Sequence, residues 1–200
     1  VPMNAPAVVC NGAALYDFQA ETYLETMELP EAVRVQGQAV LDRFPAAAVE
    51  AYHLDNVIHA VRPNALTRQH QHVTHAGVET VDSLLEVPMP LVKIMFEDEP
   101  QSLRSLWDYV RQQPWAADYE IFFSDRSLLE VTRKGASKGA MVARLAERLG
   151  ISREHIYCAG DENNDLSMLT MAAQGFAPAN CVENVKNCGA AIVADCDHDT

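Results

Sequence analysis

The chain has 200 residues and a formal charge of −13, with 48% hydrophobic and 22% charged residues. This composition is typical of a folded globular protein, and the length suits one large domain or two small ones. Nucleic acids and anionic membranes both attract clustered Lys and Arg. The strong negative charge therefore argues against either partner.

No run of residues approaches the roughly 20 apolar positions of a membrane-spanning helix. Residues 1–4 lack the basic stretch followed by an apolar stretch that marks a signal peptide. Because residue 1 is Val rather than Met, we expect that it is not the natural start. The cysteines include no C-x-x-C pair, which favours free thiols and a cytoplasmic location. They are Cys10, Cys158, Cys181, Cys188 and Cys196.

The first predicted element is a short apolar strand over residues 7–10, which ends in the turn dipeptide Asn11-Gly12. The long middle segment, residues 15–124, mixes helical and strand-like patterns without a regular alternation. We expect helices at 31–44 and 100–112, and strands at 49–54, 91–96 and 119–123. This irregular order predicts an α+β insertion between residues 1–14 and 125–200, which we expect to form one core domain.

The last third alternates helices and strands. Ser137 is a good N-cap, apolar residues recur at helical spacing over 138–149, and Gly150 stands where a helix-ending glycine belongs. Further expected elements are strands at 156–160, 176–178 and 190–194, and helices at 166–172 and 182–188. Short connections between them predict an α/β fold with a Rossmann-like, doubly wound parallel sheet.

Two groups of residues have the chemistry of zinc ligands. One comprises Cys181, Cys188 and Cys196, which we interpret as core and loop thiols. The other is the segment with His70, His72 and His75, which has no carboxylate at metal-ligand spacing. We interpret that segment as a solvated face of the inserted region.

The strongest motif is Gly-Asp-Glu-Asn-Asn-Asp at residues 160–165, directly after an apolar strand. Ligands of open α/β sheets bind at the carboxyl ends of the strands, and a carboxylate there can hold a hard cation such as Mg²⁺. Asp161 is the first such carboxylate, Asn164 can donate to a phosphoryl oxygen, and Asp165 can fix the loop or a metal-bound water. The alternative is a purely structural role, in which this segment is a polar turn that caps the next helix.

A second motif, Ser137-Lys138-Gly139, opens the helix expected at 138–149. Free N–H groups and the helix dipole favour an anion at this end, and Lys138 adds a positive charge. Most lysines are simply surface residues, but one helix and one strand separate Lys138 from Asp161. A crossover of that length can return both residues to the same sheet edge.

Together, residues 135–139 and 160–165 resemble the third and fourth motifs of haloacid dehalogenase phosphatases, and more narrowly the Cof-type group with a large α/β (C2B) cap. Asn11-Gly12-Ala13 resembles the segment that precedes the cap, and residues 176–180 resemble the strand and loop after the fourth motif. The resemblance covers nearly the whole chain, with residues 15–124 as the cap domain.

The resemblance implies an enzyme that hydrolyses small phosphorylated metabolites, such as sugar phosphates, with Mg²⁺ as cofactor. Lys138, Asp161 and Asp165 would be catalytic, Asp161 and Asp165 would hold the metal, and Lys138, Asn164 and Asn11 would bind substrate. The family reaction transfers the phosphoryl group to an aspartate and then hydrolyses that aspartyl-phosphate.

The sequence departs from the family at the first motif, an Asp-x-Asp that supplies the nucleophile. The pairs formed by Asp195, Asp197 and Asp199 have this spacing, but neither is followed by Gly-Thr, and we interpret them as an acidic tail. We expect that the motif lies in a segment preceding Val1 and that the 200 residues alone are inactive. The alternative is a non-catalytic phosphate- or partner-binding protein. A nucleotide-binding Rossmann domain is excluded because its glycine motifs are absent.

Overall fold

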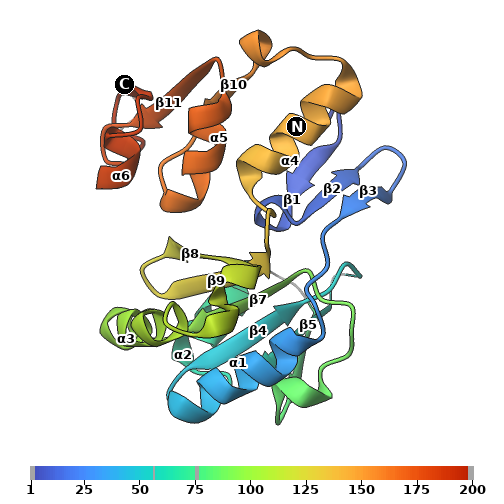
Figure 1. Cartoon of the computed structure of the whole chain (residues 1–200), viewed down its shortest axis with the longest axis vertical. Coiled ribbons are helices and arrows are strands. Elements are labelled where there is room, and N and C mark those ends of the chain that lie inside the picture. The colour runs from blue at the N-terminus through green and yellow to red at the C-terminus, as the bar shows by residue number, and fades with distance from the viewer. Residues whose placement is uncertain (1–2, 56, 75–76, 198–200) are drawn as a thin grey trace. The chain divides into compact units, whose positions relative to one another are not determined.

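The computed structural model describes residues 3–55, 57–74 and 77–197, and the chain divides into two compact units. Unit 1 combines Val1–Thr26 with Gly135–Thr200, and unit 2 is the continuous segment Met27–Lys134. The two segments of unit 1 are coloured blue and orange-red in Figure 1, and unit 2 runs from light blue to yellow.

Unit 2 is built on a six-stranded sheet with the strand order β6-β5-β4-β7-β9-β8. Its neighbouring strands are antiparallel except for β5 and β6, which are parallel. The strands are β4 (Ala48–Tyr52), β5 (Val57–Val61), β6 (Gly77–Val81), β7 (Lys93–Glu97), β8 (Tyr119–Asp125) and β9 (Leu128–Arg133). The helices are α1 (Ala32–Arg43), α2 (Ala65–Thr74) and α3 (Pro100–Val110).

Strand alternation decides what each face of this sheet contacts. Successive side chains point to opposite faces, so Val49 and Ala51 share one face with Phe96, while Glu50 and Glu97 lie on the other. The first face packs against α1 and α3 in a continuous apolar core. The second face carries α2, which contacts β4 (Figure 1). One face is therefore apolar and the opposite face is rich in charge.

The described residues of unit 1 form two three-stranded sheets. The first is antiparallel, in the order β1 (Ala7–Val9), β2 (Ala14–Asp17) and β3 (Thr22–Thr26). The second is parallel, in the order β10 (Tyr157–Ala159), β11 (Gln174–Pro178) and β12 (Ala191–Val193). The helices are α4 (Lys138–Leu149), α5 (Leu166–Met171) and α6 (Glu183–Lys186).

The predicted α/β fold class, with a sheet of parallel strands, is confirmed. The structure corrects two details. The strand at Ala7–Val9 pairs with β2 in an antiparallel sheet, so the described strands of unit 1 do not form one sheet. The boundaries between the units also fall at 26/27 and 134/135 rather than at 14/15 and 124/125. The first boundary falls later than expected because β2 and β3 pair in the same sheet as β1. The second falls later because β9 pairs with β7 in the sheet of unit 2.

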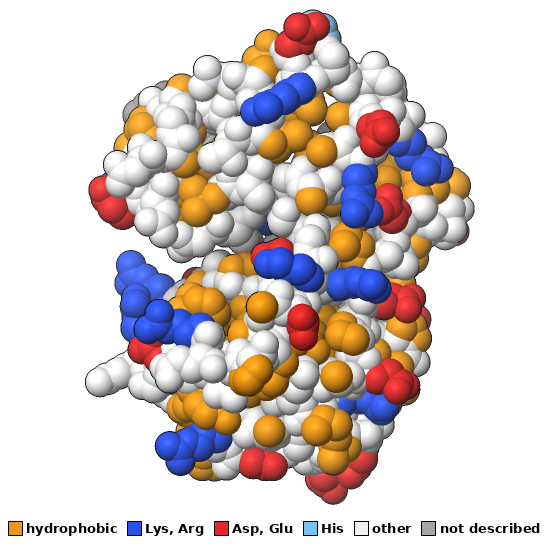
Figure 2. All heavy atoms as spheres, viewed as in Figure 1, with side chains coloured by type: hydrophobic (Ala, Val, Ile, Leu, Met, Phe, Trp, Pro, Cys, Tyr) orange, Lys and Arg blue, Asp and Glu red, His pale blue; other side chains and the backbone are white. Residues whose placement is uncertain are grey.

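Surface charge is mixed on the face shown in Figure 2, where acidic side chains lie scattered among basic ones on both units. Among the described residues, no helix has the length and apolar content needed to cross a membrane.

Candidate functional site

The loop after β10 is shaped by one buried carboxylate. Asp165, 4% exposed, accepts hydrogen bonds through Oδ2 from the backbone N–H groups of Asp161 (2.9 Å) and Glu162 (3.1 Å). These bonds close a short 3₁₀ turn at Asn163–Asp165 that leads into α5. At Gly160 an added Cβ would lie 2.5 Å from the Cβ of Asp165, so the loop closes tightly only because residue 160 is glycine.

Lys138 reaches this loop from the first turn of α4. Ser137 caps the helix by accepting the N–H of Ala140 at 3.2 Å, as its sequence position predicted. The Nζ atom of Lys138 lies 2.5 Å from Oδ1 of Asp165, and 27% of the lysine side chain is exposed. The ion pair joins the two predicted motifs, and the lysine side chain remains partly exposed.

Asn11 and Asn164 also meet in unit 1, where Nδ2 of Asn164 donates to Oδ1 of Asn11 at 3.3 Å. Asn11 has left-handed backbone angles (φ 53°, ψ 32°), which asparagine tolerates better than most residues. Gly12 follows with φ 97°, and a Cβ there would lie 2.2 Å from the backbone of Ser137. The loop after β1 therefore lies directly against the N-terminus of α4.

Two polar groups of the site remain available to a ligand. The Oδ1 atom of Asn164 is buried and, among the described residues, has no hydrogen-bond partner. Asp161 is exposed, and its carboxylate makes no hydrogen bond or ion pair with the described part of the chain. Asn11 and Lys138 also line one hollow together with apolar residues of β1, α4 and α5.

The five predicted site residues thus fall into two connected sets within unit 1. Lys138, Asp161 and Asp165 are joined by side-chain and backbone contacts, and Asn11 is joined to Asn164. Both oxygens of Asp165 already accept from neighbours, whereas the carboxylate of Asp161 is open. The geometry therefore gives Asp165 a positioning role and leaves Asp161 as the more accessible of the two carboxylates.

Sequence reasoning missed Ser167, whose Oγ accepts the N–H of Gly139 at 3.0 Å and ties α4 to α5. A Cβ on Gly139 would lie 2.2 Å from the carbonyl oxygen of Ser167. The glycine after the lysine is therefore the sequence signal for this close helix contact. It keeps the N-terminus of α4 beside the loop that begins α5.

The candidate zinc ligands behave differently from one another. Cys181 and Cys188 belong to an apolar cluster of unit 1, as interpreted, and the exposed Cys196 contacts Asn180. The interpretation of His70 as solvated was wrong, because its Nδ1 atom lies 2.9 Å from Oε2 of Glu50. Glu50 lies 20 residues earlier in the chain, on β4, and it meets His70 because α2 packs against β4.

Some residues from these predictions lie outside the described part of the chain. They are His75 and Asp199.

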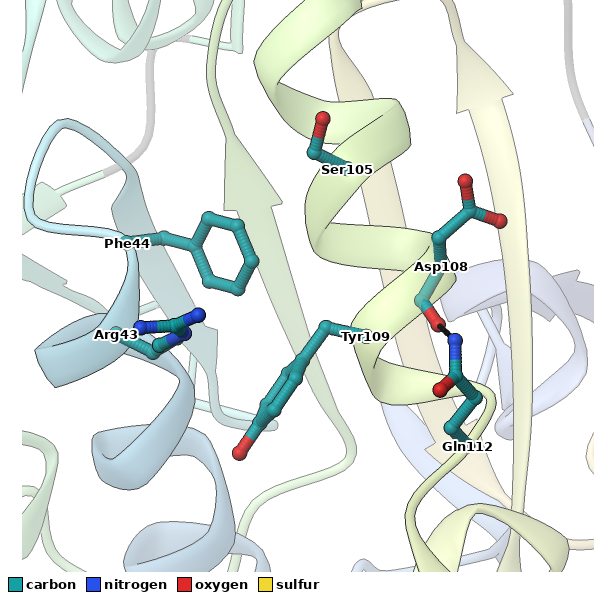
Figure 3. Close-up of a pocket in the computed structure, with 6 residues that line it drawn as sticks. All are labelled: Arg43, Phe44, Ser105, Asp108, Tyr109 and Gln112. Atoms are coloured by element: carbon teal, nitrogen blue, oxygen red, sulfur yellow. Dashed lines mark hydrogen bonds between the residues drawn. The ribbon is translucent and has the colours of Figure 1, made fainter.

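Unit 2 has another surface pocket, between the end of α1 and α3 (Figure 3). Phe44 and Tyr109 meet edge to face there, with ring centroids 5.7 Å apart. Arg43 lies beside these rings, and Gln112 turns back to the carbonyl oxygen of Asp108 (Figure 3). The pocket contains none of the predicted site residues.

A strand-loop-helix unit with a fixed carboxylate, a lysine at a helix N-terminus and an inserted α/β domain define a hydrolase of the haloacid dehalogenase type. The sequence matches the haloacid dehalogenase-like hydrolase family over residues 1–200, and the chain belongs to that family.

Individual relatives extend the comparison. The pyridoxal phosphate phosphatase YbhA of Escherichia coli is 24% identical over 96% of this chain and 73% of its own length. The phosphatase YwpJ of Bacillus subtilis is 30% identical over 76% of this chain and 51% of its own length. The fold is shared with the subclass IIB sugar phosphatase BT4131, with a TM-score of 0.81 and 22% identity over 96% of this chain and 71% of that structure.

Proposed function

We propose that this chain belongs to a magnesium-dependent phosphatase of small phosphorylated metabolites, with sugar phosphates as the first substrate class to test. The observation that carries the proposal is the contact of 2.5 Å between Lys138 and Asp165, which joins a helix N-terminus to the loop after β10. Family membership and the named phosphatase relatives support catalysis over a non-catalytic binding role.

The chain's own residues suit the binding of a phosphoryl group. Lys138 and the N–H groups at the start of α4 favour an anion at this edge of unit 1. The side-chain amide of Asn164, held by Asn11, can donate a hydrogen bond to a phosphoryl oxygen. Asp165 anchors Lys138 and the backbone of residues 161–162, so these groups are positioned before substrate arrives.

The donor set also fits Mg²⁺, which prefers oxygen ligands and keeps several waters. Asp161 would bind the ion directly, and Asp165 would hold the loop that carries Asp161. The ion, when bound, neutralises charge on the phosphoryl oxygens. Lys138 would also neutralise charge on the phosphoryl oxygens, since its ammonium group contacts Asp165 of the same loop.

The proposed reaction breaks the P–O bond of a phosphate monoester, releases an alcohol and consumes one water. In the family route an aspartate attacks phosphorus first, and water then cleaves the aspartyl-phosphate. The 200 residues contain no Asp-x-Asp-Gly-Thr motif to supply that aspartate. The assay therefore needs the protein as the cell makes it, with any residues that precede Val1.

A charge-matched pair of lysine variants tests the proposal. Lys138→Ala should lower kcat/KM about 10²–10³-fold, because it removes a charge that stabilises the transferring phosphoryl group. Lys186→Ala removes the same charge from an exposed position on α6 and should stay within about twofold. Steady-state hydrolysis of an aryl phosphate with Mg²⁺ measures both. Equal activities would show that Lys138 is an ordinary surface lysine.

A substrate panel then resolves the chemical class. Hexose and pentose phosphates, pyridoxal phosphate and an aryl phosphate should be compared by kcat/KM. Preference for sugar phosphates supports the proposed class, and preference for pyridoxal phosphate would place the protein with YbhA instead. Phosphate binding without turnover of any compound would favour the non-catalytic alternative.

A further inference from the structure

The charged face of the unit 2 sheet gathers a carboxylate–histidine cluster, defined as Glu50, His70 and Glu97. Glu50 on β4 and Glu97 on β7 point to the same face, because Ala48 pairs with Glu97 and Glu50 pairs with Met95. The helix α2 covers this face and contributes His70. One nitrogen and two carboxylates thus converge from three elements that lie far apart in the sequence.

The spacing of these atoms suits a small cation. His70 Nδ1 lies 2.9 Å from Glu50 Oε2 and 3.5 Å from Glu97 Oε1, and one ligand atom from each residue lies within 4.8 Å of the others. Zinc binds nitrogen and oxygen ligands at about 2.0–2.2 Å, which places ligands of one ion at separations of about 3–3.5 Å. The observed separations need only small adjustments to accept an ion.

Glu97 provides an independent sign that the cluster is incomplete by itself. Its side chain is fully buried, and neither carboxylate oxygen has a hydrogen-bond partner in the described structure. Thr67 lies close to the Glu97 carboxylate, but its hydroxyl donates a hydrogen bond to Asn64 Oδ1, at 3.2 Å. A buried carboxylate without a hydrogen bond is costly, so this pair of oxygens points to a missing ligand at the cluster.

The negative charge of this face is balanced by one lysine and, when it is protonated, by His70. Glu50, Glu97 and Glu130 are all nearly or fully buried, and Lys93 is the cation paired with Glu130, at 3.0 Å. With His70 neutral, two negative charges on the face remain uncompensated. A divalent cation would neutralise them.

We propose that Glu50, His70 and Glu97 bind one divalent first-row transition metal ion, for which Zn²⁺ is the probe. A histidine nitrogen with two carboxylates favours such an ion over Mg²⁺, and three protein ligands leave a position open to water. This site is separate in sequence and in unit from Asp161, and it does not rest on the proposed function.

Neighbouring groups hold Glu50 in the orientation that the site needs. Gln71 Nε2 donates to Glu50 Oε1 at 2.9 Å, and the Tyr52 hydroxyl donates to Oε2 at 2.7 Å. Burial raises the pKa of Tyr52 far above its usual range, so its hydroxyl remains a donor. Hydrogen bonds of this kind orient metal ligands and tune their affinity.

Calorimetric titration with Zn²⁺ tests the site in an Asp161→Asn/Cys196→Ser background, which removes the open carboxylate of the loop after β10 and the exposed thiol. We expect one Zn²⁺ per chain in this background. Glu97→Gln and His70→Ala should each weaken binding at least about 10–100-fold. Glu99→Gln makes the same change two residues from Glu97 at an exposed position and should bind as the background protein does.

Circular dichroism shows whether each variant is folded. If Glu97→Gln does not fold, His70→Ala tests the site in its place. Three results would overturn the proposal. They are the absence of Zn²⁺ binding by the background protein, unchanged affinity in folded Glu97→Gln and His70→Ala variants, and equal loss in Glu99→Gln.

Discussion

Asp165 of unit 1 and Glu97 of unit 2 are both buried carboxylates, but they differ in the hydrogen bonds that they accept. Asp165 accepts two backbone N–H groups and pairs with Lys138, and its backbone donors lie within four residues of it. Glu97 is fully buried, and its oxygens have no hydrogen-bond partner within the described residues. A carboxylate that accepts hydrogen bonds from its own loop fixes that loop, whereas a buried carboxylate without a hydrogen bond can accept a ligand.

The largest stability effect should come from removing the paired carboxylate. Asp165→Ala leaves two N–H groups and Lys138 without their acceptor and should destabilise unit 1 by about 2–4 kcal/mol. Asp161→Ala removes an exposed carboxylate and should change stability by less than about 0.5 kcal/mol. The rate of thiol labelling at Cys181, which is 5% exposed, measures the opening of unit 1. Similar rates in the two variants would contradict the structural role of Asp165.

A smaller effect of opposite sign is expected at Glu97 in protein kept metal-free with a chelator. Burial raises the pKa of Glu97 from 4.5 to about 7 in the folded state. Folding therefore favours the protonated form, and stability falls as the pH rises from about 4.5 to 7. Glu97→Gln should stabilise unit 2 at pH 8 by about 1–3 kcal/mol, since one pKa unit corresponds to about 1.4 kcal/mol.

His70 should act in the same direction, because its hydrogen bond to Glu50 raises its pKa above 6.5. Its contribution is present below pH 6.5 and is lost as the pH rises through the raised value. Urea unfolding followed by tryptophan fluorescence reports unit 2, since both tryptophans, Trp107 and Trp115, lie there. A pH profile for Glu97→Gln that matches the wild-type profile would refute the predicted ionisation of Glu97.

The smallest predicted effect concerns the N-cap of α4. Ser137→Ala removes the acceptor for the N–H of Ala140 and should destabilise unit 1 by about 1 kcal/mol. Ser152→Ala is the control, because Ser152 precedes a 3₁₀ turn without a side-chain cap hydrogen bond. Thiol labelling at Cys181 measures both variants. An equal response would show that the cap contributes nothing specific.

The sequence predicted the parts of the fold that depend on neighbouring residues. The helix expected at 138–149, with its cap and its terminal glycine, is the helix observed, and the strand before residue 160 ends one residue earlier than expected. The proximity of the motifs that carry Lys138 and Asp165 could also be predicted, because one helix and one strand separate them. Local spacing carries this information without knowledge of the sheet.

Other features depend on strand pairing and were not visible in the sequence. The hairpin of β2 and β3 was assigned to the inserted region, although its partner is β1. The Glu50 cluster was missed because its carboxylates come from β4 and β7 and its histidine from α2. Only the register of β4 against β7 shows that Glu50 and Glu97 share a face.

If the loop after β10 is a magnesium and phosphate site, a Mg²⁺ titration followed by backbone amide NMR should show it. In the protein as the cell makes it, Mg²⁺ should shift the signals of residues 160–165, and Asp161→Asn should weaken the apparent affinity at least about tenfold. Asp108→Asn, an exposed change on α3, should leave the affinity unchanged. Unchanged Mg²⁺ affinity in Asp161→Asn, or shifts centred on Glu50 and Glu97 instead, would show that the loop after β10 is not the Mg²⁺ site.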